Sequence, residues 1–240
     1  MAASIEIQGA GVSFHFDGQR RVLSPTLARM HPRRRRTWGL RHVDLRVGPG
    51  EGVALVGPTG AGKSTLLQLI AGIVGPDEGT VRVAGRVGTL LAIQAGPTSR
   101  LTGRENAELL SVLDGVPRTR AAAAADEVKE LTGLGESFEL PLSSYSQGMR
   151  ARLGFAVVAR SGADVLLLDE AHEALDHEFR AVMADHARGL LRRGGIVIAA
   201  GHDHPAIAPM CERAVLLRGG AVVDGGPFAR VVGDYVPAAA

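Results

Sequence analysis

The residues best suited to chemistry form a glycine-rich loop between the apolar run 53–56 and the helical pattern 66–70. The loop consists of Gly57, Pro58, Thr59, Gly60, Ala61, Gly62, Lys63, Ser64 and Thr65. Its glycines let the backbone turn N–H groups inward around phosphates, and the new helix adds the positive end of its dipole. Lys63 would reach the β- and γ-phosphates of a nucleotide, and the Ser64 hydroxyl would ligate Mg²⁺. The spacing therefore predicts a nucleotide-binding loop rather than a turn that happens to contain a lysine.

Two acidic residues, Asp169 and Glu170, follow the apolar stretch 165–168. A wholly apolar strand is typical of a parallel sheet covered on both faces, where chemistry gathers at the carboxyl ends of the strands. Asp169 would hold Mg²⁺ together with Ser64, and Glu170 would accept a proton from a water that attacks the γ-phosphate. The alternative is that the pair only caps a helix. The phosphate loop earlier in the chain favours the catalytic interpretation.

A histidine and an aromatic residue complete the candidates that the residues themselves suggest. His202 follows the apolar run 196–200, so it would lie at the carboxyl end of a strand and could hydrogen-bond the γ-phosphate. Phe16 or Phe14, in the alternating stretch 12–16, would offer a ring to stack on adenine. The alternative for both phenylalanines is that they fill the core.

The elements that must position these residues predict a mixed α/β fold. Strand patterns occur at 5–7, 12–16, 43–47, 53–56, 80–83, 87–93, 165–168 and 196–200. Residues 104–160 change character and contain three helical patterns, at 105–113, 121–131 and 149–159. We therefore expect an inserted α-helical subdomain at about 97–160 within an α/β core.

Length and composition limit what this core belongs to. The chain has 240 residues, 45% hydrophobic and 22% charged, which is typical of one large globular domain over 1–240. Its apolar runs are the length of strands, so we expect no membrane span. The sequence does not open with a charged segment followed by an apolar one, so we also expect no signal peptide. The single cysteine, Cys211, excludes an internal disulfide and is typical of a reducing cytoplasm.

Arginine is concentrated in residues 17–41, although the formal net charge is only +2. The run Arg33, Arg34, Arg35 and Arg36 precedes the single tryptophan, Trp38. One interpretation is a solvated loop. The functional interpretation is contact with anionic lipid headgroups, worth about 1 kcal/mol per arginine at a membrane. Nucleic acid is the competing partner and is disfavoured, because a single-strand binder would interleave more aromatic rings.

Taken together, these motifs resemble those of an ATP-binding-cassette (ABC) ATPase along almost the whole chain. The shared order is 57–65, Gln94, 146–149, 168–170, Asp176 and His202. The resemblance implies a P-loop NTPase (RecA-like) core with an antiparallel β subdomain and an inserted α-helical subdomain. It also implies hydrolysis of ATP with Mg²⁺, coupled to transport.

The resemblance further implies roles for residues outside the phosphate loop. Gln94 would join the metal site and link it to a membrane partner. Residues 145–149 would be the signature loop, whose Ser146 and Gly148 complete the ATP site of a partner subunit, and Asp176 would lie between the two sites. The chain would thus form a homodimer. The signature departs from the common pattern in having Gln147 and Met149, where glycine and glutamine are usual.

A closer similarity is to the ATP-binding subunits of exporters for surface polysaccharides of the O-antigen and teichoic-acid type. It depends on the basic segment before 38–43 and on the stretches 101–106 and 145–156, whereas 97–98 and 173–176 depart from that subgroup. It implies a separate integral membrane permease and a cytoplasmic location at the inner face of the membrane. Because the chain stops at Ala240, we expect no C-terminal carbohydrate-binding domain. The alternatives are export of a drug or another lipid, a soluble ABC ATPase without transport, and an ATP-binding regulator.

Overall fold

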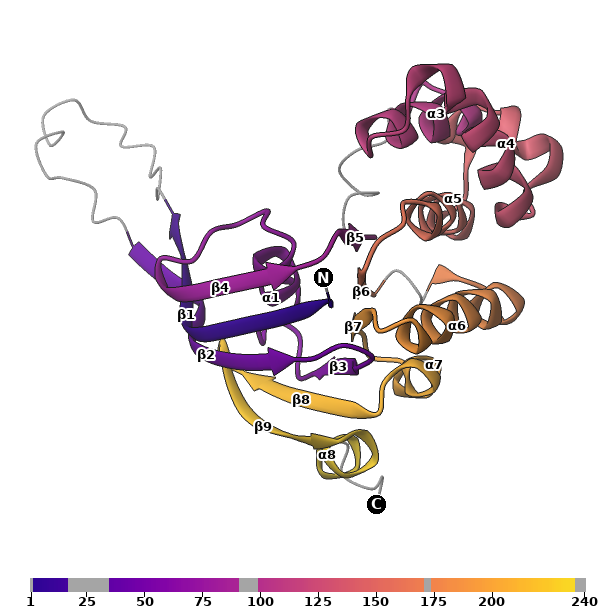
Figure 1. The fold of residues 1–240 in the computed structure, drawn as a ribbon. Helices are drawn as coiled ribbons and strands as arrows, with labels where there is room; N and C mark the ends of the chain where they lie inside the picture. Colours follow the sequence, from indigo (N-terminus) through magenta and orange to yellow (C-terminus); the bar gives the residue numbers. More distant parts are fainter. Residues whose placement is uncertain (1, 17–34, 91–98, 171–173, 236–240) are drawn as a thin grey trace, which may run out of the picture.

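Two β-sheets of different kinds run through the protein (Figure 1). The computed structural model describes residues 2–16, 35–90, 99–170 and 174–235, with the backbone alone at 15–16 and 35–36. Within these residues a three-stranded antiparallel sheet has the order β2-β1-β4, and a six-stranded sheet has the order β5-β6-β7-β3-β8-β9. The strands are β1 Ser4–Phe16, β2 Arg35–Val47, β3 Gly52–Val56, β4 Glu78–Ala84, β5 Val87–Thr89, β6 Val165–Asp169, β7 Ile196–Ala200, β8 Arg213–Arg218 and β9 Ala221–Pro227.

The six-stranded sheet is parallel except for β9, which pairs antiparallel with β8. All residues of β3 and β7 are buried, as expected for parallel strands covered on both faces. Alternate residues of β3 enter two different cores. Val53 and Leu55 pack toward α1 (Lys63–Ile70) and the antiparallel sheet, whereas Ala54 and Val56 pack toward α6 (His177–Arg192). The buried sheet thus fixes the carboxyl ends of β3, β6 and β7 beside one another.

The antiparallel sheet corrects two expectations drawn from the sequence. The stretches 5–7 and 12–16 are a single strand, β1, whose pairing shifts register around Gly9 and Gly11. The arginine run is not wholly a loop, because β2 begins at Arg35 and pairs Arg35 with Phe16. Bulges of this kind add residues without ending a strand, so a break in the alternation does not mark a turn.

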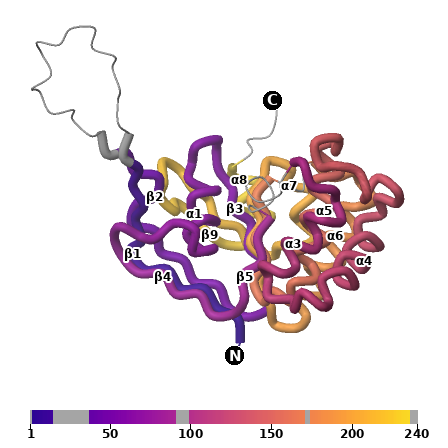
Figure 2. Tube along the Cα trace, turned by 90° about the horizontal axis from the view of Figure 1, so that it is seen from above, coloured from indigo at the N-terminus to yellow at the C-terminus, as the bar shows by residue number. Residues whose placement is uncertain are grey.

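The inserted α-helical subdomain contains α3 (Gly103–Leu113), α4 (Ala121–Thr132) and α5 (Gln147–Arg160). Helix α3 begins with a capping box, in which Thr102 and Glu105 each accept a hydrogen bond from the other's backbone N–H. The three helices share a core of their own around Phe138, Leu142 and Leu153. Figure 2 shows this subdomain and the antiparallel sheet at opposite ends of the molecule. The predicted limits of the subdomain, 97–160, begin in residues outside the described part.

Several elements were not among those predicted from the sequence. They are α6, α7 (His204–Ile207), β8, β9 and α8 (Phe228–Tyr235). Helix α6 packs on α5 through Phe155 and Phe179, whose rings meet edge to face with centroids 5.7 Å apart. Within the described residues, none of these helices combines the length and the apolar character that crossing a membrane requires.

Candidate functional site

The glycine-rich loop joins β3 to α1 and curves around the ammonium group of its own lysine. Lys63 is buried, and its Nζ donates hydrogen bonds to the carbonyl oxygens of Gly57 at 2.8 Å and Pro58 at 3.4 Å. Ser64 is exposed at the first turn of α1. The N-cap of this helix is Gly62, which has no side chain to cap the first N–H groups, and the first turn contains no acidic residue. The loop therefore presents a cation, a hydroxyl and a helix N-terminus, which suit a phosphate group.

Two glycines outside the loop hold it in place. Gly220, in the turn between β8 and β9, donates its N–H to the carbonyl of Ala61 at 3.0 Å and accepts from the N–H of Arg41 in β2 at 2.8 Å. A Cβ atom on Gly62 would lie 2.8 Å from the carbonyl O of Gly39, and one on Gly220 would lie 2.7 Å from the same oxygen. The phosphate loop, β2 and the β8–β9 turn thus approach one another as closely as backbones can.

The acidic pair lies at the carboxyl end of β6, beside β7. Asp169 is the last residue of β6 and pairs with Ala200 of β7, and Glu170 donates its N–H to the carbonyl of Ala200 at 2.9 Å. Glu170 has a φ of 48°, a left-handed conformation that is uncommon for glutamate. Such strained residues concentrate at functional sites, where the surrounding structure holds them.

His202 comes from the segment after β7 and meets the glutamate. Its Nε2 lies 3.5 Å from Oε1 of Glu170, and both side chains are about half exposed. Strand β7 lies between β6 and β3, so the two side chains and the phosphate loop occupy neighbouring positions along one edge of the sheet. The structure therefore brings together the phosphate loop, Asp169, Glu170 and His202 from three strands.

The predicted signature loop begins α5. Ser146 is the N-cap of this helix, and its Oγ accepts a hydrogen bond from the N–H of Met149 at 3.1 Å. A Cβ atom on Gly148 would lie 2.9 Å from the carbonyl O of Ala174. Asp176 is the N-cap of α6 and accepts from the N–H of Phe179 at 2.9 Å. The signature loop and the segment 174–176 therefore lie against each other within one chain.

Some predicted site residues cannot be placed in this arrangement. Gln94, Arg33 and Arg34 lie outside the described residues, as do the side chains of Arg35, Arg36 and Phe16. The side chain of Phe14 is described and is 37% exposed. A Cβ atom on Gly39 would touch the Phe14 ring at 2.6 Å and the methyl group of Thr65 at 3.4 Å, so this ring lies close to the end of the phosphate loop.

The metal-ligating groups near the loop are few. Across the described residues, no three side chains of His, Cys, Asp or Glu converge so as to hold a metal ion. One hydroxyl and one carboxylate, with substrate phosphates and water, are the ligands that Mg²⁺ prefers, so Ser64 and Asp169 fit it. Cys211 is no candidate nucleophile, because burial raises the pKa of its thiol to about 12.

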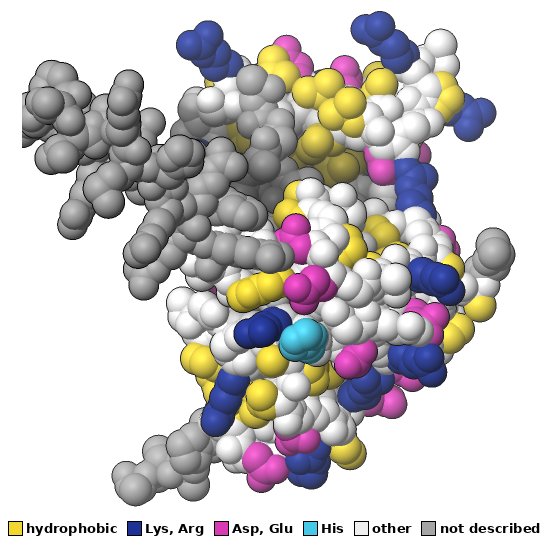
Figure 3. Space-filling view, turned by 90° about the vertical axis from the view of Figure 1, so that its left-hand side faces the viewer, with side chains coloured by type: hydrophobic (Ala, Val, Ile, Leu, Met, Phe, Trp, Pro, Cys, Tyr) yellow, Lys and Arg dark blue, Asp and Glu magenta, His cyan; other side chains and the backbone are white. Residues whose placement is uncertain are grey.

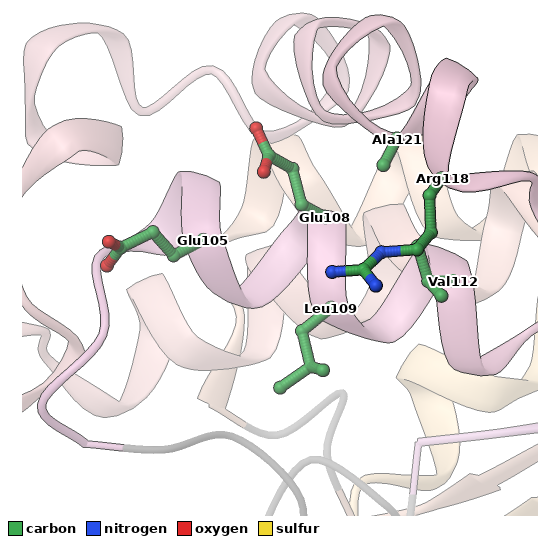
Figure 4. Close-up of a pocket in the computed structure, with 6 residues that line it drawn as sticks. All are labelled: Glu105, Glu108, Leu109, Val112, Arg118 and Ala121. Carbon is green, nitrogen blue, oxygen red and sulfur yellow. The ribbon is translucent and has the colours of Figure 1, made fainter.

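A pocket lies in the α-helical subdomain, between α3 and the start of α4 (Figure 4). This pocket has a volume of about 520 Å³ and is lined by Glu105, Glu108, Leu109, Val112, Arg118 and Ala121. Figure 4 shows the Arg118 side chain extending across it toward α3. Leu109, which lines the pocket, is 38% exposed, and Leu113, the last residue of α3, is 75% exposed. In the space-filling view of Figure 3, hydrophobic side chains form a group at the top of the molecule, with charged side chains of both signs around them and also scattered below.

Sequence reasoning missed several residues that shape the site. Gly39 and Gly220 act through contacts with residues far away in the chain, which a local pattern does not encode. The pair Gly219-Gly220 between two apolar runs is nevertheless a hairpin signal and would have predicted the β8–β9 turn. Arg152 and Arg180, described below, gave no local signal.

Comparison with known proteins identifies the family of this chain. The family model described as ABC transporter matches residues 40–173. The O-antigen export system ATP-binding protein RfbB of Klebsiella pneumoniae is 34% identical over 217 residues, which are 88% of each chain. The teichoic acids export ATP-binding protein TagH of Lactiplantibacillus plantarum is 32% identical over 200 residues, which are 83% of this chain and 55% of that relative.

Solved structures give the same result for the fold. A dimeric structure of a post-hydrolysis state of the ATP-binding cassette MJ0796, bound to ADP and Pi, has a TM-score of 0.77. The match covers 93% of this chain and 98% of the other at 21% identity. The fold class predicted from the sequence is thus confirmed.

Proposed function

Because the chain belongs to the ABC transporter family, we propose that it is the ATP-hydrolysing subunit of an exporter for a cell-surface polysaccharide or glycolipid. The observation that carries the hydrolytic part is the meeting of Glu170 and His202 beside the phosphate loop. The observation that supports a polysaccharide or glycolipid as the exported substrate is the similarity to O-antigen and teichoic-acid export proteins. No feature of the described site favours a drug or another lipid over a glycan.

The phosphate loop would bind the β- and γ-phosphates of ATP. Lys63 would exchange its two carbonyl partners for phosphate oxygens, while the N–H groups of the loop and of α1 supply further donors. Ser64 and Asp169 would hold Mg²⁺, whose positive charge would stabilise the negative charge that develops on the phosphate oxygens. Phe14 or Phe16 would stack on adenine at the end of β1.

Hydrolysis would begin at Glu170. Its carboxylate takes a proton from a water molecule, the water oxygen bonds to the γ-phosphorus, and the bond to the ADP oxygen breaks. His202 would hydrogen-bond a γ-phosphate oxygen and hold the transferred group in line with the attacking water. The bond from the Glu170 N–H to Ala200 keeps the carboxylate at the end of β6 while this happens.

Each ATP site would be completed by a second copy of the chain. Ser146 is exposed at the N-terminus of α5, where a hydroxyl, N–H groups and the helix dipole can all face a phosphate. Gly148 would let the backbone approach the nucleotide closely. With Lys63 of one copy and Ser146 of the other on each ATP, two sites would open and close together, and Asp176 would lie between them.

The membrane partner would be a separate permease. The pocket that contains Leu109, with the exposed Leu113 near it on α3, would offer the permease's cytoplasmic segment an apolar docking surface with charged residues around it. Gln94 would connect that docking surface to the metal site. The chain would therefore act at the inner face of the membrane, where the run Arg33–Arg36 contacts anionic lipid headgroups.

The test is reconstitution of this protein with its permease. Proteoliposomes that hold both proteins should hydrolyse ATP faster when the glycan substrate is supplied, and an unrelated drug or lipid should not raise the rate. ATP hydrolysis that never responds to any glycan would count against polysaccharide export while leaving the ATPase function in place.

A further inference from the structure

One arginine of α5 connects three parts of the chain. The guanidinium of Arg152 forms an ion pair with the carboxylate of Asp176, and its NH1 donates to the carbonyl of Thr132, the last residue of α4, at 3.3 Å. Its central carbon also lies 5.0 Å from the centre of the Phe179 ring in α6. This side chain is 25% exposed, whereas that of Asp176 is 49% exposed. Arg152 therefore joins the α-helical subdomain to the segment 174–176.

The same segment is also held from the side of the core. Arg180 of α6 donates from Nε to the carbonyl of Leu175 at 2.8 Å, and its NH1 lies 2.7 Å from Oδ2 of Asp203. Asp203 follows His202 directly and caps α7. Leu175 itself is buried. The segment 174–176 is thus fixed to the part of the molecule that carries His202, and Arg152 is its charged connection to α5.

We propose that Arg152 is a positioning residue, which keeps the signature loop and the segment 174–176 in register so that both enter a neighbouring subunit's ATP site together. The proposal rests on the ATPase function above and deepens it. Asp176 has two carboxylate oxygens with different tasks: Oδ1 caps α6, and Oδ2 pairs with Arg152. If the pair is lost, the cap remains but the carboxylate is no longer tied to α5.

Arginine suits this position better than lysine. Its planar guanidinium can donate in two directions at once and still lie over an aromatic ring, which a single ammonium group cannot do. Asparagine caps a helix about as well as aspartate, so Asp176→Asn removes the charge and retains the cap. The pair can therefore be broken from either side without unfolding α6.

A second arginine on α5 offers a matched control. Arg160 forms an ion pair with Glu127 of α4, at side-chain exposures of 42% and 47%, and so it also joins α5 to α4. It has no described contact with the segment 174–176. If Arg152 only stabilised the packing of α5 on α4, losing either arginine would have the same effect.

The experiment measures kcat and KM for ATP, with thermal melting, for Arg152→Gln, Asp176→Asn, the double variant, Arg152→Lys and Arg160→Gln. We expect kcat to fall roughly tenfold in Arg152→Gln and in Asp176→Asn, with KM changed less than about twofold because the phosphate loop is untouched. The kcat of the double variant should be no lower than that of the less active single variant, since both changes break the same interaction. Arg152→Lys should recover part of the loss, and Arg160→Gln should keep the wild-type kcat.

Three results would overturn the proposal while leaving the ATPase function standing. The first is a wild-type kcat in Arg152→Gln, and the second is a pair of losses at 152 and 176 that multiply in the double variant. The third is an equal loss of kcat in Arg160→Gln, which would show that Arg152 only stabilises the packing of α4 against α5. A wild-type protein without any ATPase activity would instead contradict the proposed function itself.

Discussion

Oε1 of Glu170 and Nε2 of His202 lie 3.5 Å apart, across the carboxyl ends of two neighbouring strands. This separation is longer than a normal hydrogen bond, so a phosphate oxygen or a water molecule can replace the contact at little cost. The two side chains come from segments that are 32 residues apart, and only the buried pairing of β6 with β7 brings them together. The proposed hydrolytic centre therefore depends on the packing of the sheet and not on either motif alone.

Glu170→Gln should abolish most of the turnover and keep ATP binding. The amide cannot accept a proton from water, and general-base catalysis is typically worth about 10²–10⁴ in rate. We expect the ATP-bound dimer to accumulate, which size-exclusion chromatography with ATP would detect. A control is Glu136→Gln, a carboxylate in the α-helical subdomain. Normal turnover in a folded Glu170→Gln protein would remove this residue from the mechanism.

Gly220→Ala should weaken nucleotide binding without touching a ligand-binding side chain. At φ +81° the new Cβ would lie 2.7 Å from the carbonyl O of Gly39, so the turn must move and release the bond to Ala61. The control is Gly219→Ala, at φ +55°, where a Cβ would meet nothing within 4 Å. Both changes carry backbone strain of about 1–3 kcal/mol in the free energy of unfolding.

The difference between these two glycine variants is the informative measurement. We expect the dissociation constant for ATP to rise several-fold in Gly220→Ala only, as measured by isothermal titration calorimetry. Equal affinities in the two variants would show that the β8–β9 turn does not support the phosphate loop.

Mixing two inactive variants should restore ATPase activity if the sites are shared. Lys63→Ala removes the phosphate contact, and Ser146→Arg fills the space at the start of α5. A hybrid dimer gathers both changes in one site and leaves the other site intact, provided that one intact site can turn over. Native mass spectrometry would confirm that hybrids form. Activity that then stays at the level of the single variants would argue that both residues serve one nucleotide within one chain.

Acid should weaken the α-helical subdomain through Glu139. Hydrogen bonds from Arg104 and then Lys129 lower the pKa of this carboxyl from 4.5 to about 2. Because its pKa is lower in the folded state, the carboxylate contributes stability that is present above pH 4.5 and lost as the pH falls toward 2. Glu139→Gln should therefore lower the melting temperature at pH 7 and converge with the wild type near pH 2. A constant difference across that range would exclude the ionised carboxylate as the cause.

The sequence was sufficient to predict those elements whose signal is local. The loop 57–65, the strand before Asp169 and the three helices of the inserted subdomain follow from glycine spacing, apolar runs and helical periodicity. Helix α6 is absent from the predicted elements, although Phe179, Met183, Ala187 and Leu190 form the apolar face of a helix that begins after a capping aspartate. These residues would have predicted α6.

Other features depend on contacts that no local pattern encodes. The bulged strand β1 reads as two strands because Gly9 and Gly11 interrupt the alternation. The approach of Gly39 to Gly62, and the ion pair between Arg152 and Asp176, join residues 23 and 24 positions apart. Their partners are decided by how sheets and helices pack, after each element has formed.

The burial of Cys211 makes the native chain a convenient background for site-specific labelling. With a pKa raised to about 12, its thiol contributes almost no reactive thiolate at neutral pH, and the sequence contains no second cysteine. A cysteine introduced at the exposed Gln147 would then take up a maleimide or spin label selectively. The separation of two such labels would report the opening and closing of a dimer directly, without first removing a native residue.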